Sequence, residues 1–151
     1  MPVYYVEGDP LLTKAQVLAV GHNARGRTEV DPLHTALQAK YPAAFATYAR
    51  RCANAKIKTG TLWMWHDSRP QLGFMVVRES NVSATRLRYL EAVALTLARD
   101  HALEGIKSVA MVAPGSALEW TALKEVIQRW LAPSSLPVIV YEKYVAGVMA
   151  E

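Results

Sequence analysis

The sequence predicts an α/β fold in which a central mixed sheet of about six strands lies between layers of helices. Short apolar runs alternate along the chain with longer segments whose apolar residues recur at helical spacing. The clearest example is residues 106–144, where an apolar run at 107–112 precedes Pro114-Gly115, a helix and a second apolar run at 138–141. This order of strand, turn, helix and strand is typical of α/β proteins.

The helix in this stretch has a defined start. Ser116 and Glu119 fit a capping box, in which each residue accepts a backbone N–H of the other. A helix N-terminus directly after a glycine turn is an anion site in many α/β proteins, because unpaired N–H groups and the helix dipole converge there. A tight turn without a ligand is the alternative.

The other elements follow in the order that a layered α/β fold requires. Strands are predicted at 3–6, 17–20, 61–65 and 72–77, from short runs of apolar, β-branched and aromatic residues. Asp31 and Pro32 begin a helical segment that reaches Cys52, with Pro42 bending or restarting it, and another helix spans 85–100. No repeat or linker interrupts the chain, so residues 1–151 are expected to form one domain.

The composition is that of a globular protein. Of the 151 residues, 52% are hydrophobic and 20% are charged, and no apolar run is as long as a membrane span. The start of the chain does not resemble a signal peptide, and the single cysteine, Cys52, suits a reducing compartment, so we expect a soluble, cytoplasmic protein. The net charge of +4 mildly favours anionic ligands. No His/Cys spacing resembles a zinc site, and neither a metal nor a cofactor is expected.

Polar loops follow four of the predicted strands, at residues 8–9, 21–29, 78–81 and 113–116. Because ligands of open α/β sheets bind at the carboxyl ends of the strands, these loops are expected to surround one cleft. Gly115 and Ser116 are candidates to hold a phosphate there, and the arginines Arg25, Arg27 and Arg78 are candidates to add charge-assisted hydrogen bonds. Surface loops built from turn residues are the alternative.

Several polar residues have both a functional and a structural interpretation. Asp9 is a candidate adenine contact or a turn former before Pro10, and Asp31 is a candidate catalytic group or a helix N-cap. His22 and His34 are candidate acid–base groups or residues of the core or surface. No G-x-S-x-G, G-x-G-x-x-G or P-loop lysine motif is present, which argues against covalent catalysis.

Several segments together resemble the macro domain family. Residues 6–9, VEGD, and a strand ending near Asn23 resemble the family's "GD…VNAAN" beginning, and residues 30–34, VDPLH, resemble its "VDxxIH" helix start. Residues 108–111, 118–120 and 138–142 are similar to "SIAMP…LDW…VxVYE", a pattern of the branch that contains the DarG group of DNA ADP-ribosyl glycohydrolases and related deacylase-type macro domains. The resemblance spans nearly the whole chain and implies the three-layer α/β/α macro fold.

The resemblance also implies an ADP-ribose site, and Asp31 matches the acid that positions water in MacroD-type members. The implied ligand-binding residues are Asp9 and Tyr141 at the adenine, Gly115, Ser116 and Ala117 along the pyrophosphate, and Gly21, His22 and Asn23 beside the distal ribose.

The chain departs from the family pattern at the same site. Val20 stands where the family has its first Asn, and only Gly26 remains of the glycine-rich loop that follows. The loop at 114–117 is shorter than its family counterpart. Arg78 stands closest to the catalytic lysine of the DarG-like branch, and arginine stays protonated, so it cannot replace that lysine as a nucleophile or base.

The resemblance implies binding of ADP-ribose or a related nucleotide, with removal of ADP-ribose from protein or nucleic acid as a further activity to be tested. The lost glycines, Arg78 and the basic charge leave a second interpretation open, a non-catalytic macro-like module that binds another nucleotide, nucleic acid or a protein partner. A structural domain whose cleft has closed is the third.

Overall fold

A six-stranded mixed sheet forms the centre of the computed structural model, which describes residues 3–151. The strand order is β1-β6-β5-β2-β4-β3, in which all neighbours pair in parallel except β3, which is antiparallel to β4. The strands are β1 (Val3–Gly8), β2 (Val17–Asn23), β3 (Leu62–Trp65), β4 (Gln71–Arg78), β5 (Val109–Val112) and β6 (Val138–Tyr144). The predicted mixed α/β sheet is therefore confirmed.

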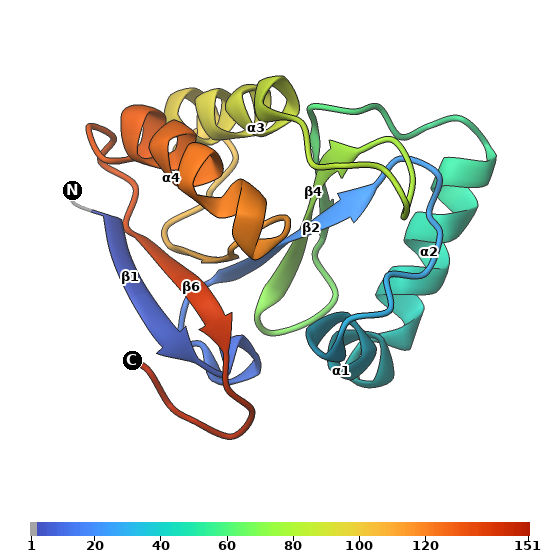
Figure 1. The fold of residues 1–151 in the computed structure, drawn as a ribbon, viewed down its shortest axis with the longest axis horizontal. Coiled ribbons are helices and arrows are strands. Elements are labelled where there is room, and N and C mark those ends of the chain that lie inside the picture. Colours follow the sequence, from blue (N-terminus) through green and yellow to red (C-terminus); the bar gives the residue numbers. More distant parts are fainter. Residues whose placement is uncertain (1–2) are drawn as a thin grey trace.

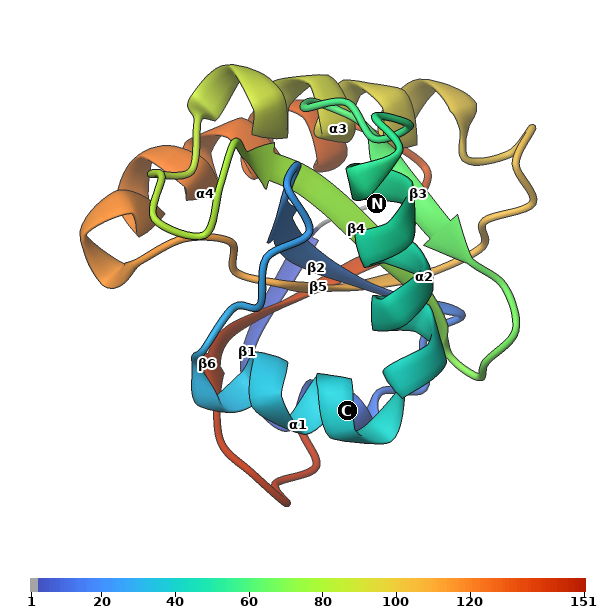
Figure 2. The same cartoon turned by 90° about the vertical axis from the view of Figure 1, so that its right-hand side faces the viewer.

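Helices cover both faces of this sheet (Figures 1 and 2). They are α1 (Pro32–Lys40), α2 (Pro42–Ala53), α3 (Leu87–Asp100) and α4 (Ala117–Leu131), with a short 3₁₀ helix, η1, at Pro10–Leu12. The predicted helical segment at 31–52 is two helices, because Pro42 begins a second one. Within residues 3–151, no helix combines the length and the apolar character that crossing a membrane requires.

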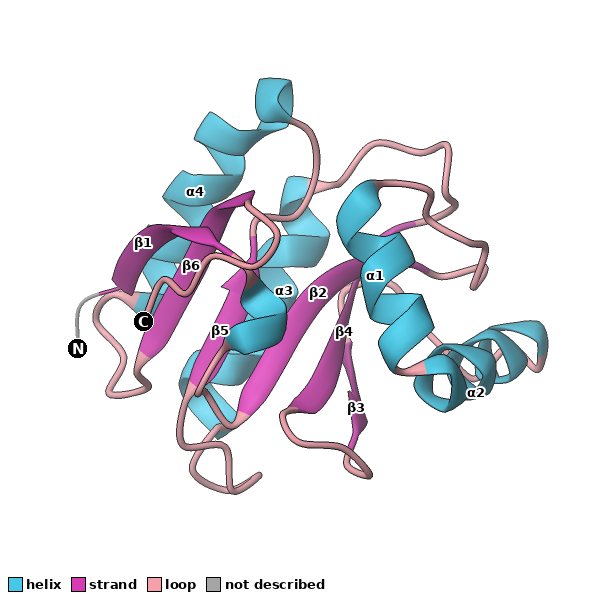
Figure 3. Cartoon of the chain, turned by 90° about the horizontal axis from the view of Figure 1, so that it is seen from below, coloured by secondary structure: helices cyan, strands magenta, loops and turns pink. Residues whose placement is uncertain are grey.

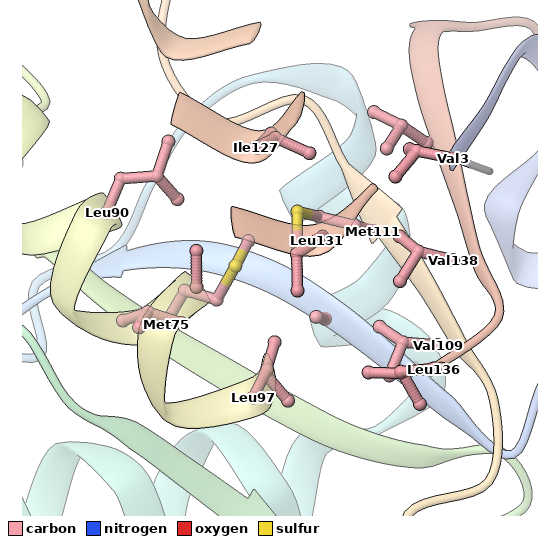
Figure 4. Close-up of a cluster of buried hydrophobic side chains, with 14 of the residues drawn as sticks. Val3, Met75, Leu90, Leu97, Val109, Met111, Ile127, Leu131, Leu136 and Val138 are labelled. Atoms are coloured by element: carbon pink, nitrogen blue, oxygen red, sulfur yellow. The ribbon is translucent and has the colours of Figure 1, made fainter. Parts of the chain in front are cut away.

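Strand β2 runs through the middle of the sheet, and all seven of its residues are buried (Figure 3). Its side chains alternate between two hydrophobic clusters, with Val17 and Ala19 on the side of α3 and α4, and Leu18 and Val20 on the side of α1 and α2. The α3/α4 cluster includes Met75, Leu90, Leu97, Met111, Ile127 and Leu131 (Figure 4). An apolar run with no polar alternation is what a parallel strand covered on both faces requires.

The α1/α2 side of the sheet holds a group of aromatic rings around His22. The centroid of its ring lies 4.6 Å from that of Tyr48, 5.6 Å from Phe74 and 5.8 Å from Phe45. Only 3% of His22 is exposed, and this burial, with the nearby His34 ring, lowers its pKa to about 3. His22 is therefore a neutral core residue at physiological pH.

Residues 145–151 fold back against the end of β1. The N–H of Val145 donates to the Gly8 oxygen at 2.8 Å, and the N–H of Asp9 donates to the Val148 oxygen at 2.7 Å. The carboxylate of Asp9 accepts the N–H of Leu11 at 3.0 Å and that of Gly147 at 2.8 Å. Asp9 thus caps η1 and fastens the C-terminal segment at the same time.

We expect Asp9→Ala to lower the free energy of unfolding by about 1–3 kcal/mol, because two backbone N–H groups lose a charged acceptor. Chemical denaturation measures this directly. Asp67→Ala is the matched control, since Asp67 is exposed in the loop between β3 and β4, and its loss should change stability by less than about 0.5 kcal/mol. Equal effects of the two substitutions would contradict the assigned role.

The low pKa of His22 predicts a specific loss of stability in acid. Between pH 6.5 and pH 3 the unfolded chain binds a proton at this ring that the folded chain does not, so stability falls as the pH falls. The slope is at most about 1.4 kcal/mol per pH unit. We expect His22→Phe to flatten the dependence of unfolding free energy on pH in this range. Parallel curves for His22→Phe and the wild type would refute this.

Candidate functional site

A cleft of about 550 Å³ lies at the carboxyl ends of β2, β4, β5 and β6. This is the edge of the sheet where the polar loops were expected to meet. It is lined by Gly21, Glu29, Asp31, Pro32, Leu33, His34, Arg78, Asn81, Ser83, Thr85, Val112, Ala113, Pro114, Gly115, Ser116, Glu119, Tyr141, Glu142 and Tyr144.

The glycine turn before α4 forms one wall of the cleft. Gly115 has φ +89°, and a Cβ there would lie 2.8 Å from Glu119 Oε1 and 2.9 Å from Leu123 Cδ1, so both backbone and space require glycine. Ser116 is the N-cap of α4, and its N–H donates to Glu119 Oε1 at 2.7 Å, as the capping box predicts.

Glu119 also joins this turn to the loop before α3. Its second oxygen, Oε2, accepts the N–H of Thr85 at 3.0 Å. The carboxylate therefore holds two loops of the cleft together from the first turn of α4. The N–H of Glu119 is bonded to Ser116, whereas the N–H groups at the very start of a helix have no intrahelical acceptor and can bind an anion.

Asp31 and His34 form a bonded pair on the opposite wall. The carboxylate of Asp31 accepts the backbone N–H of His34 at 2.9 Å, which confirms the predicted N-cap, and its other oxygen lies 2.7 Å from His34 Nδ1. The opposite ring nitrogen, Nε2, lies 2.8 Å from the Gly21 oxygen. A carbonyl oxygen only accepts hydrogen bonds, so Nε2 is the donor there.

The carboxyl group of Asp31 is ionised at neutral pH. Partial burial would raise the pKa of this carboxyl, but the hydrogen bonds and the charge of His34 outweigh burial and lower it to about 2. The Asp31 side chain is 50% exposed while that of His34 is buried, so the ionised carboxylate faces the cleft and the ring supports it from behind. This is a group that can orient a bound water or hydroxyl but is a weak proton acceptor.

Asn23 closes the loop that follows β2. Its Oδ1 accepts the N–H of Arg27 at 3.0 Å, and its Nδ2 donates to the Arg27 oxygen at 2.9 Å and to Glu29 Oε2 at 2.8 Å. The side chain is fully buried and does not line the cleft. Its amide is thus occupied by the chain itself.

Some of the predicted site residues meet at the cleft and others do not. The lining includes Gly21, Asp31, Arg78, Gly115, Ser116 and Tyr141, and Ala117 follows directly in α4. Outside the lining lie Asp9, His22, Asn23, Arg25 and Arg27, of which the two arginines are exposed in the loop after β2. Thr85, Glu142 and Tyr144 also line the cleft, although none was a candidate site residue; Glu142 ends the family-like pattern at residues 138–142, whereas Tyr144 belongs to no motif.

Tyr141 and Glu142 build the base of the cleft from β6. The Tyr141 hydroxyl donates to Glu151 Oε2, and burial together with this carboxylate raises the pKa of Tyr141. Glu142 Oε2 accepts from Trp120 Nε1 at 2.8 Å and from Lys124 Nζ at 3.0 Å, so its charge is paired on the α4 side. Among residues 3–151, no group of three or more His, Cys, Asp or Glu residues is arranged to hold a metal ion.

Solved structures share this architecture, whereas no protein-family model and no curated protein sequence matches the chain. The macrodomain of Thermus aquaticus DarG is 19% identical, with a TM-score of 0.81 over 93% of this chain and 97% of that one. The macrodomain of Mycobacterium tuberculosis DarG is 18% identical, with a TM-score of 0.80 over 92% and 96%. Thermosipho africanus DarTG, solved in complex with ADP-ribose, is 18% identical, with a TM-score of 0.84 over 99% of this chain and 43% of that one.

These matches extend over nearly the whole chain. At this level of identity they establish architecture. The chain has the macrodomain fold.

Proposed function

We propose that this chain binds ADP-ribose or a closely related nucleotide in the cleft at the carboxyl edge of its sheet. The observation that carries the proposal is the cleft itself, which joins a glycine turn, the start of a 15-residue helix and a half-exposed carboxylate around about 550 Å³. That volume is within the range of about 300–1,000 Å³ typical of small-molecule sites. The fold shared with a protein solved in complex with ADP-ribose supports the choice of ligand.

The proposed contacts follow the geometry of the lining. Gly115, Ser116 and Ala117 offer the backbone of the helix start to the pyrophosphate. Tyr141 flanks the adenine, and Gly21 lies beside the distal ribose. Asp9 is bonded to Leu11 and Gly147 and lies outside the lining, so we propose that it shapes this end of the cleft through residues 145–148.

Gly115→Ala tests the phosphate wall. The added Cβ would displace the turn, so we expect the Kd for ADP-ribose to rise at least about tenfold, equivalent to about 1.4 kcal/mol. Isothermal titration of ADP-ribose, ADP and AMP into the wild type and the variant gives the comparison.

Gly105→Ala is the matched control for this experiment. Gly105 also has a positive φ, +72°, but a Cβ there meets nothing within 4 Å, so it introduces the backbone strain without touching the cleft. We expect Gly105→Ala to lose about 1–2 kcal/mol of stability through backbone strain, Gly115→Ala to lose at least as much because its Cβ also clashes, and only Gly115→Ala to lose affinity. If titration of ADP-ribose, ADP and AMP into the wild-type protein gave no heat of binding, the proposed nucleotide function would be refuted.

Removal of ADP-ribose from a protein or nucleic acid is the second candidate, and the ionised Asp31 carboxylate in the cleft favours it. In such a reaction Asp31 would orient the attacking water. The Asn23 amide is bonded to its own loop and is not available to a ligand, and an arginine stays protonated, so Arg78 cannot serve as a base. A module that binds without hydrolysis is the alternative that these two features support.

If Asp31 orients water, Asp31→Asn should slow release of ADP-ribose at least about 100-fold while its affinity changes little, because asparagine retains the N-cap. The pKa of about 2 keeps the carboxylate ionised, so titration of Asp31 should not reduce the rate between pH 8 and pH 4.5. Release of labelled ADP-ribose from modified protein and from modified DNA measures both expectations. Wild-type protein that binds ADP-ribose but releases none from either substrate would identify a binding module.

A further inference from the structure

Arg78 is a buried cation in the floor of the cleft. The residue is only 8% exposed, and it occupies the last position of β4, where it pairs with Asn23 of β2. Its guanidinium reaches back to lie beside Gly21. Of the described residues that line the cleft, it is the one lysine or arginine.

The hydrogen-bonding capacity of Arg78 is largely unused. A guanidinium has five N–H donors. Nη1 donates to Thr85 Oγ1 at 3.3 Å, whereas the buried Nε has no hydrogen-bond partner among the described residues. Burying a charge without full hydrogen bonding is costly, and such a group retains a strong demand for acceptors.

The nearest carboxylate does not meet this demand. Glu29 Oε2 lies 3.6 Å from Arg78 Nε, which is an ion pair but too far for a hydrogen bond. The same oxygen already accepts the Asn23 amide at 2.8 Å. Glu29 therefore keeps the charge of Arg78 balanced in the empty cleft without saturating its donors.

The other carboxylates that line the cleft are committed elsewhere. Asp31 is paired with His34, Glu119 accepts the two N–H groups of Ser116 and Thr85, and Glu142 is paired with Lys124. None of these three carboxylates is bonded to Arg78 in the structure. An incoming acceptor would not have to displace any of these carboxylates from the guanidinium.

The surrounding residues leave room at the guanidinium and connect it to the phosphate wall. A Cβ at Gly21 would lie 3.2 Å from Arg78 Nη2, so glycine keeps this side of the guanidinium uncovered. Thr85 Oγ1, the partner of Nη1, lies 3.1 Å from the position of a Cβ at Gly115. Arg78, Thr85 and the glycine turn thus form one continuous donor surface.

We propose that Arg78 and Thr85 form an oxyanion subsite in the cleft floor that takes one phosphate group of the ligand. The planar guanidinium can bind two phosphate oxygens through two parallel N–H groups held in one fixed plane, whereas an ammonium group acts as a point charge without this geometry. The phosphate comes from the pyrophosphate of the nucleotide or from a free phosphate ion. The inference rests on the proposed nucleotide function only for the first of these sources.

Arg78→Gln and Arg78→Lys test the subsite by isothermal titration with ADP-ribose, pyrophosphate, inorganic phosphate and adenosine. We expect Arg78→Gln to weaken binding of ADP-ribose and pyrophosphate at least about tenfold, and Arg78→Lys to restore only part of the loss because the two-pronged contact is missing. Weak binding of uncharged adenosine should not change. Arg51→Gln, which removes an exposed charge from the end of α2, is the matched control and should have no effect.

A measurement on the wild type covers the case in which Arg78→Gln does not fold. The Nε–H resonance of Arg78, assigned by its loss in Arg78→Lys, should shift on saturation with pyrophosphate or ADP-ribose. A resonance that stays in place, or unchanged affinity in Arg78→Gln, would overturn the subsite. Loss of affinity only for ADP-ribose and pyrophosphate identifies the nucleotide as the source of the phosphate, whereas equal loss for inorganic phosphate identifies a free-anion site.

The outcomes separate this inference from the nucleotide function. ADP-ribose binding that is independent of Arg78 would refute the subsite and leave the function intact. Pyrophosphate binding that depends on Arg78, without any binding of ADP-ribose, would refute the function and leave the subsite intact. Absence of binding by all charged ligands to the wild type would refute both.

Discussion

Two side-chain hydrogen bonds to the end of β2 hold the cleft in place. His34 Nε2 donates to the Gly21 oxygen at 2.8 Å, and the Tyr48 hydroxyl donates to the Asn23 oxygen at 2.7 Å. One bond comes from α1 and the other from α2, so both helices are tied to the carboxyl edge of the sheet. Each oxygen is buried, and an unsatisfied buried carbonyl would cost about 1–3 kcal/mol. The position of the cleft floor therefore depends on the packing of these two helices.

This arrangement explains why the two sides of β2 differ. On the α1/α2 side, His22 fills the space with a neutral ring among Phe45, Tyr48 and Phe74, and the burial that keeps it neutral also keeps it away from ligand. On the α3/α4 side, the absence of a side chain at Gly21 leaves the floor open. The alternation of a strand thus places a core residue and a cleft residue next to each other in sequence.

Sequence patterns predicted the structural features that depend only on residues close together in the chain. The capping box at Ser116, the N-cap at Asp31 and the buried runs of the strands are local signals, and all are present. The environment of Asp9 was only partly predictable in this way. Its bond to the Leu11 N–H is the local contact of a turn former, but the second N–H group on its carboxylate belongs to Gly147, at the far end of the chain. The contact between Arg78 and Thr85 likewise depends on how the loop before α3 returns to the sheet. Contacts between residues that are far apart in the sequence therefore decide which polar residues of a motif line the cleft.

The charges in the cleft also bear on its chemistry. Asp31 remains ionised far below neutral pH, and Arg78 remains protonated far above it. Proton transfer is most efficient when a group's pKa lies near the working pH, and neither group meets that condition. Fixed charges of opposite sign on two sides of one cavity instead orient a polar ligand without changing state. The geometry consequently favours recognition of a phosphate-bearing ligand, with any hydrolysis limited to water that the Asp31 carboxylate positions.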